Sequence, residues 1–246
     1  KTDRIVVVTD PGSPMEVAAK ADGYRVFNAD PTVGGRYSAL TAFGIVPSGL
    51  AGADIAGLLQ DAQEAAKVLA TDSVDNPGLI LGAALARTPG EMGFRDKIGV
   101  VADGTPIVGF GDWAEQLIAE STGKQSKGVL PVVLDPKSAE LHSGLADLLA
   151  VHVQADAKPV AGDAVSVSGS LGAQFMLWEY ATVVASRLIG INPFDQPDVE
   201  SAKIAARGML EQRDAVIAPL FTDSNVEVRA TELQISGTSV ADAIKA

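Results

Sequence analysis

The 246-residue chain contains no cysteine, which excludes disulfide bonds, thiolate nucleophiles and sulfur-bound metals. Basic residues are also scarce, because 19 Lys and Arg stand against 31 Asp and Glu, for a net charge of −12. Nucleic acids and anionic membranes are bound by clustered basic residues, so the composition argues against both partners. No apolar run reaches the roughly 18 residues that a membrane-spanning helix needs. A chain without cysteine is compatible with a reducing cytoplasm, where we expect this protein.

With 47% hydrophobic residues, the chain can bury a full core. Short apolar runs alternate with amphipathic stretches, which is typical of a parallel sheet with helices on both faces. We therefore predict an α/β fold with a doubly wound parallel sheet flanked by helices. The runs that we expect to form strands are residues 5–8, 24–28, 98–102, 129–134, 148–153, 188–191 and 226–235.

Helix signals stand between these runs. Ser13 as N-cap, Pro14 at the first helical position and Glu16 three residues after Ser13 predict a helix start, and Gly23 predicts its end. Further helices are expected within residues 38–87, 169–187 and 199–213, and residues 238–245 read as the first turns of another helix.

One segment combines a glycine pair with a single arginine. Residues 30–44 read Asp-Pro-Thr-Val-Gly-Gly-Arg-Tyr-Ser-Ala-Leu-Thr-Ala-Phe-Gly. Gly34 and Gly35 permit a turn with positive φ and the close approach of a ligand, and Arg36 offers a fork of donors that suits an oxyanion. An ordinary strand-to-helix turn with a solvated arginine is the alternative.

Two further segments place polar side chains on helices. Residues 113–124 read Trp-Ala-Glu-Gln-Leu-Ile-Ala-Glu-Ser-Thr-Gly-Lys, and Gln116 and Glu120 stand four apart, on one helical face. Residues 194–203 read Phe-Asp-Gln-Pro-Asp-Val-Glu-Ser-Ala-Lys, a loop with Gln196 that leads into a helix with Lys203. Solvated side chains on surface helices are the alternative for Glu120 and Lys203.

These three segments closely resemble signatures of the glucose-6-phosphate isomerase family. The resemblance implies that Glu120 is the proton-transferring base and that Arg36 steadies the enediolate intermediate. It implies a catalytic role for Lys203 at the ring oxygen or the substrate's charge, and places Gln116 and Gln196 beside the substrate. The sequence departs from the family pattern at Pro197 and Asp198, where a bulky residue and glycine are usual, and at Thr122, where the family has asparagine.

The histidines give a weaker match. The family's strand ends in Glu-Pro, and a histidine follows the Glu by seven positions, the spacing that separates Asp135 from His142 here, although the residues between them differ. The resemblance implies that His142 helps to open the sugar ring in the neighbouring subunit, and an exposed loop histidine is the alternative. His152 lies in an apolar run, where a satisfied core histidine is expected.

Other polar groups are read mainly as structure. Glu179 lies on an expected helix and is a candidate partner behind the site. Ser166, Ser168 and Ser170 around Gly169 could hold a phosphate at a helix start, and an ordinary capped helix explains them equally well. No metal-ligand cluster or dinucleotide fingerprint is present, so we expect chemistry without a metal or cofactor.

The resemblance also implies a domain organisation. Residues 1–35 are similar to the last βαβ piece of a first sugar-isomerase (SIS) half, and residues 36–246 to the second SIS-type, flavodoxin-like three-layer domain. The family's phosphate-gripping Ser/Thr loop has no counterpart before residue 5, so we expect a fragment that is inactive alone, taken from a compact bacterial form of a homodimeric enzyme. The alternatives are a dual glucose/mannose 6-phosphate isomerase and a sugar-phosphate-binding SIS module without catalysis.

Overall fold

A computed structural model describes residues 2–86, 88–90, 93–162, 164–211, 217–230 and 237–245. The chain divides into two units, Lys1–Gln196 and Pro197–Ala246, each described by itself. The predicted boundary after residue 35 separates two parts by their resemblance to a family rather than by their contacts, and it stays a prediction. In the described parts of the chain, no helix has the length and apolar character needed to span a membrane.

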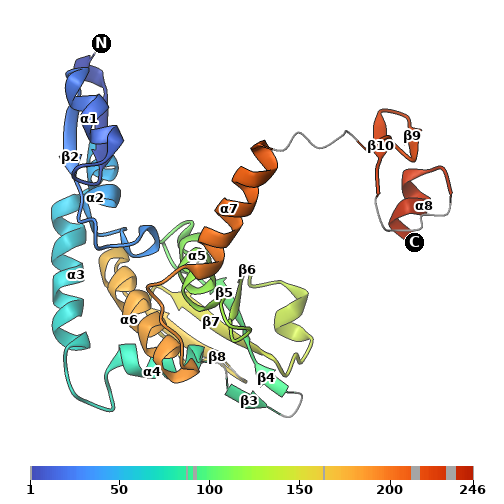
Figure 1. The fold of residues 1–246 in the computed structure, drawn as a ribbon. Coiled ribbons are helices and arrows are strands. Elements are labelled where there is room, and N and C mark those ends of the chain that lie inside the picture. Colours follow the sequence, from blue (N-terminus) through green and yellow to red (C-terminus); the bar gives the residue numbers. More distant parts are fainter. Residues whose placement is uncertain are drawn as a thin grey trace. The chain divides into compact units, whose positions relative to one another are not determined.

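The first unit is built on a four-stranded parallel sheet with the order β6-β5-β7-β8 (Figure 1). The sequence predicts three of its strands, and their bounds are Lys97–Ala102 (β5), Leu130–Leu134 (β6) and Leu148–Gln154 (β7). The fourth, Ala164–Ser168 (β8), was not predicted, because its Ala-Val-Ser-Val-Ser sequence is short and partly polar. Ser166 and Ser168 therefore lie in a strand.

Three helices cover one face of the sheet: Pro77–Leu85 (α4), Phe110–Thr122 (α5) and Leu171–Ile189 (α6). Their apolar side chains, such as Trp178 of α6, form the core with alternate residues of β5 and β7, such as Val100 and Val151. Each of these three residues is at most 2% exposed. The parallel sheet and the helices that pack on it confirm the predicted α/β fold with a parallel sheet flanked by helices.

Glycines let α6 pack closely against its neighbours. Helix Ile55–Leu69 (α3) lies beside α6 (Figure 1), where a Cβ on Gly172 would be 2.1 Å from the carbonyl oxygen of Leu58. On the α4 side, a Cβ on Gly82 would be 2.5 Å from Cβ of Val184. The predicted helical region before residue 87 is thus confirmed as α2 (Ala42–Leu50), α3 and α4.

The N-terminal segment forms a parallel βαβ unit of Val6–Thr9 (β1), Pro14–Ala21 (α1) and Arg25–Asn28 (β2). The predicted cap is confirmed, because Ser13 Oγ accepts a hydrogen bond from Glu16 N at 3.1 Å and Pro14 opens the helix. A short 3-10 helix, Thr2–Arg4 (η1), precedes this unit, and Gly35–Tyr37 (η2) follows it.

One predicted strand is wrong. Residues 188–191 lie at the end of α6, which runs to Ile189 and ends where Gly190 adopts φ 77°. A short apolar run does not distinguish a strand from a buried helix end, and here the helix continues through it until glycine supplies the left-handed cap.

The remaining elements are short. Thr88–Gly90 (β3) and Gly93–Arg95 (β4) pair antiparallel, and Ala139–His142 (η3) is a 3-10 helix. The second unit contains Pro197–Glu211 (α7), the antiparallel pair Phe221–Asp223 (β9) and Val226–Val228 (β10), and Val240–Lys245 (α8). The predicted strand at residues 226–235 is thus shorter, and its residues 231–235 lie outside the described residues, as do residues 212–213 of the predicted helix.

Candidate functional site

Arg36 lies in η2 and is buried, with 3% of its surface exposed. Its Nε donates a hydrogen bond to Ser121 Oγ at 2.9 Å. Its Nη2 donates to two backbone carbonyls of the loop after α6, those of Pro193 and of Asp195, the latter at 3.2 Å. The guanidinium is therefore a buried cation, and the alternative of a solvated arginine is wrong.

The sequence permits a turn with positive φ at the two glycines before Arg36, but neither glycine adopts a positive φ. Gly34 has φ −67° and ψ 155°, and Gly35 is also outside the positive-φ region. Both residues are exposed, and a Cβ on either would meet no atom within 4 Å. What the glycines provide at this point is open space beside Arg36 rather than an unusual backbone.

The remaining edge of the guanidinium faces Glu120 on α5. Arg36 Nη1 lies 3.8 Å from Glu120 Oε2, and the Glu120 side chain is 36% exposed. Gln116, one turn earlier on the same helix face, donates from Nε2 to Glu120 Oε1 at 3.2 Å. The structure thus brings together Arg36, Glu120 and Gln116, with the carboxylate reachable from solvent.

The position of this cluster on the sheet is unusual. Helix α5 runs from the carboxyl end of β5 to the amino end of β6, so Glu120, in its last turn, lies toward the amino ends of the strands. Open α/β sheets usually bind ligands at the carboxyl ends of their strands. Topology alone would therefore point to the opposite edge of the sheet, and this cluster is a candidate because of its sequence motif.

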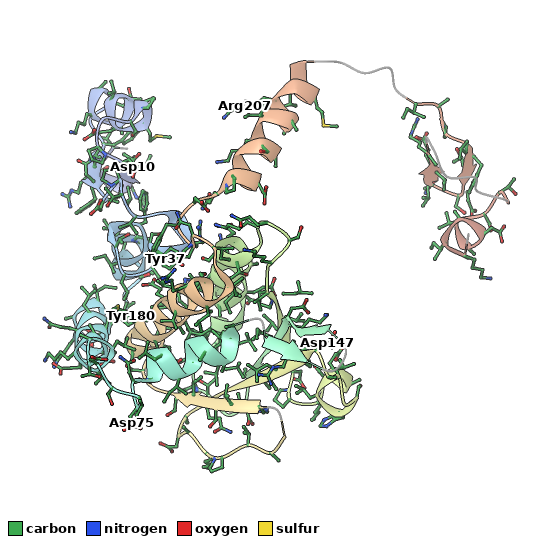
Figure 2. All side chains as sticks on the ribbon, turned by 60° about the horizontal axis from the view of Figure 1, so that its bottom comes forward. Asp10, Tyr37, Asp75, Asp147, Tyr180 and Arg207 are labelled. Atoms are coloured by element: carbon green, nitrogen blue, oxygen red, sulfur yellow. The ribbon has the colours of Figure 1, made fainter. Side chains whose placement is uncertain are left out.

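Tyr37 and Glu179 extend the cluster inward. Tyr37, labelled in Figure 2, shares a hydrogen bond with Ser121 Oγ at 3.0 Å, and burial raises the pKa of its hydroxyl. Glu179 on α6 is close enough to act on that hydroxyl electrostatically, and burial raises the pKa of Glu179 to about 8. Glu179 Oε1 has no hydrogen-bond partner among the described residues, so a neutral carboxyl is favoured there.

Lys124 is a further buried cation that sequence reasoning did not assign to the site. Its side chain is 2% exposed, and its Nζ donates to three oxygens of the loop after α6. No local signal distinguishes this lysine from a solvated one, because its acceptors lie about seventy residues away in the sequence.

Gln196 and Lys203 follow that loop. Gln196 is half-buried and directly follows Asp195, whose carbonyl Arg36 and Lys124 both bind. Lys203 is exposed on α7, which belongs to the second unit, so its role stays a prediction.

His142 lies elsewhere in the first unit. It ends η3 and lines a cavity of about 570 Å³ together with Glu140 and His152. Neither Arg36 nor Glu120 lines this cavity. The cavity therefore does not join His142 to Arg36 and Glu120 within one chain. His152 has a partner, since its Nδ1 lies 3.1 Å from Asp103 Oδ2, but it is half-buried and lines the cavity rather than lying in the core as predicted.

Within the described residues, no group of three or more His, Asp or Glu is placed to hold a metal ion. Arg36, Glu120 and Gln116 instead offer a carboxylate base next to an anion-binding donor, which can move a proton on a substrate and stabilise the negative charge that results.

Comparison with curated proteins finds relatives over part of the chain. A probable glucose-6-phosphate isomerase of Haloarcula marismortui is 38% identical over 130 residues, 53% of this chain and 29% of that protein. A glucose-6-phosphate isomerase of Lactobacillus helveticus is 28% identical over 265 residues, 85% of this chain and 58% of that protein. A Streptococcus pyogenes protein of the same name is 35% identical over 142 residues, 57% of this chain and 31% of that protein. The chain thus spans between 29% and 58% of the length of these relatives.

Solved structures share the fold. A hypothetical protein from Thermus thermophilus superposes with a TM-score of 0.69 at 22% identity, over 84% of this chain and 63% of that one. A glucose-6-phosphate isomerase from Chlamydia trachomatis superposes with a TM-score of 0.66 at 18% identity, over 85% of this chain and 53% of that one. No protein-family model matches the chain. The chain is therefore related in sequence, at modest identity, to proteins named glucose-6-phosphate isomerase.

Proposed function

We propose that the protein interconverts glucose 6-phosphate and fructose 6-phosphate through an enediolate intermediate. The observation that carries the proposal is the 3.8 Å approach of Arg36 Nη1 to Glu120 Oε2, with Gln116 bonded to the same carboxylate. The choice of substrate is based on the sequence relatives that are named glucose-6-phosphate isomerase. Because the chain spans at most 58% of those relatives, the activity is proposed for the whole protein.

The geometry suits proton transfer between neighbouring carbons. Glu120 would remove the proton from C2 of the open-chain aldose and return it to C1 of the ketose. The charge that forms on the oxygen between these steps would lie against Arg36 Nη1, the edge of the guanidinium that faces Glu120. Preorganisation supports this role, because Nε and Nη2 are already held by Ser121 and by the loop after α6.

The other predicted residues complete the proposal. Gln116 and Gln196 would position the sugar, and Lys203 and His142 would assist ring opening, His142 from the partner subunit of a homodimer. A cytoplasmic location and the SIS type of the domain rest on the same resemblance. In this proposal, ring opening and proton transfer are both carried out by side chains, without a metal or cofactor.

A coupled assay tests the function directly. Fructose 6-phosphate is supplied to the whole protein and to the 246-residue chain, and glucose 6-phosphate is measured through a dehydrogenase. We expect turnover by the whole protein and none by the chain alone. Binding of fructose 6-phosphate without turnover by the whole protein would favour the non-catalytic module, and turnover of mannose 6-phosphate would identify the dual isomerase.

Replacing the base tests the assignment of Glu120. Glu120→Gln should lower kcat by about 10²–10⁴-fold, because it removes general-base catalysis while keeping the side chain's shape. Glu115→Gln, at an exposed position of the same helix, is the matched control and should stay near the unsubstituted rate. Near-normal turnover by Glu120→Gln would contradict the proposal.

A further inference from the structure

Lys124 is buried without a part in the proposed chemistry. Its residue is 4% exposed, and an ammonium in such a place is retained only when its donors are satisfied. All three N–H donors of a lysine have acceptors here: Asn192 O at 2.7 Å, Asp195 O at 2.6 Å and Asp195 Oδ1 at 2.6 Å. Lys124 is thus committed entirely to the loop of residues 192–195.

Arg36 binds the same loop from another side. Its Nη2 donates to the carbonyls of Pro193 and Asp195, so the carbonyl of Asp195 is shared between Arg36 and Lys124. The two buried cations and one carbonyl form a continuous chain of contacts. A shift of the loop would therefore change the acceptors that orient the guanidinium.

The backbone next to Lys124 is held in an unfavourable conformation. Gln125 has φ 55° and Ser126 has φ 56°, two consecutive non-glycine residues in the left-handed region. Such conformations persist where surrounding contacts fix them. The buried Lys124 side chain supplies a fixed point on one side of this turn, and the start of β6 at Leu130 supplies the other.

We infer that Lys124 is a positioning residue, which fixes the loop of residues 192–195 and, through the carbonyl of Asp195, the edge of Arg36 that faces Glu120. Its hydrogen bonds go to Asn192 and Asp195 rather than to Arg36 or Glu120, so it acts through the loop. The effect on turnover rests on the proposed function, whereas the effect on the loop does not.

Hydrogen exchange tests the attachment without any substrate. Lys124→Met keeps the length of the side chain and removes all three donors. We expect amide exchange in the peptide of residues 190–196 to rise by about tenfold or more, as expected when a local opening becomes easier. Lys127→Met is the matched control. Among the described residues, Lys127 Nζ donates one exposed hydrogen bond, to Gly190 O at 3.3 Å, so exchange should change less than about twofold.

Steady-state kinetics of the whole protein separates positioning from a merely structural role. If Lys124 orients Arg36 for the transition state, Lys124→Met lowers kcat by about tenfold or more while KM moves by less than about threefold. A merely structural role would lower the amount of folded protein and leave both constants of the folded fraction unchanged. Lys127→Met should keep both constants.

A second variant covers the case in which Lys124→Met does not fold. Asp195→Asn removes the charge of a side chain that is 49% exposed and keeps both backbone acceptors, so it should fold and loosen the loop less. Unchanged exchange at residues 190–196 in the folded variants overturns the inference. A loosened loop in a protein that shows no turnover before substitution supports the attachment and overturns the proposed function instead.

Discussion

At the scale of the residue, Arg36 divides its donors between structure and chemistry. Nε and Nη2 are used on Ser121 and on the loop carbonyls, and Nη1 is directed at Glu120. Only a planar guanidinium can serve all three directions at once, because an ammonium is a single point charge on a flexible stem.

Arg36→Lys should therefore abolish most of the activity although it keeps the charge. We expect kcat/KM to fall by about 10²–10³-fold, the range for loss of one oxyanion donor. The coupled assay on the whole protein measures the change, with circular dichroism to establish folding. Arg187→Lys, at an exposed position of α6, should leave kcat/KM unchanged, and equal losses in both variants would argue against a special role for Arg36.

Glu179 gives the chain a pH-dependent stability. Burial raises its pKa from 4.5 to about 8, so the folded state binds the proton more tightly than the unfolded state. Its contribution to stability is complete below pH 4.5 and is lost as pH rises toward 8. Glu179→Gln should remove this loss, so its melting temperature should exceed that of the unsubstituted chain at pH 8–9.

Thermal melts from pH 5 to pH 9 check this, with Glu115→Gln as an exposed control on α5. Parallel stability profiles for Glu179→Gln and the unsubstituted chain would show that Glu179 is ionised throughout this range.

At the scale of the element, close packing around α6 sets how the helices are spaced. Gly172 leaves no room for a side chain, because its Cβ would lie 2.1 Å from the backbone carbonyl of Leu58 on α3. The backbone of a neighbouring helix cannot move aside as a flexible side chain can, so the two helices would have to separate.

Gly172→Ala should therefore destabilise the fold by about 1–3 kcal/mol, the cost of overpacking, despite the better helix propensity of alanine. Gly208→Ala on α7, where an added Cβ meets no atom within 4 Å, should be neutral or stabilising. Urea unfolding of both variants measures the difference, and a stabilised Gly172→Ala would mean that α3 and α6 have room to adjust.

The elements also show what the sequence can and cannot predict. Strands β5, β6 and β7 are apolar and follow their hydrophobic pattern, whereas β8 is half-polar and residues 188–191 continue a helix, so both were misread. In the site, Arg36 and Glu120 meet as the resemblance implies. The loop contacts of Lys124 could not be predicted, because they join residues about seventy positions apart, and two of the three go to backbone carbonyls, which carry no sequence signal.

At the scale of the whole molecule, the buried core lies in one unit. Every residue identified as buried belongs to Lys1–Gln196, and the described residues of the second unit include none. Local stability follows the burial of apolar side chains, so the two units should differ widely in their opening free energies.

Amides of α7 should therefore exchange at least about a hundredfold faster than those of α6 in the 246-residue chain. Hydrogen exchange followed by mass spectrometry resolves both helices, and the amides of α3 serve as a second reference within the first unit. Comparable protection of α6 and α7 would mean that α7 is covered by further contacts in solution.

The loop after α6 is held mainly through its backbone, so its side chains can change during evolution. Of the four loop atoms that Arg36 and Lys124 hold, three are main-chain oxygens, those of Asn192, Pro193 and Asp195, and one is the carboxylate of Asp195. Any residue presents the same carbonyl, so most substitutions in this loop should be tolerated. Genetic variation can therefore accumulate in the loop while the two cations that hold it stay under selection.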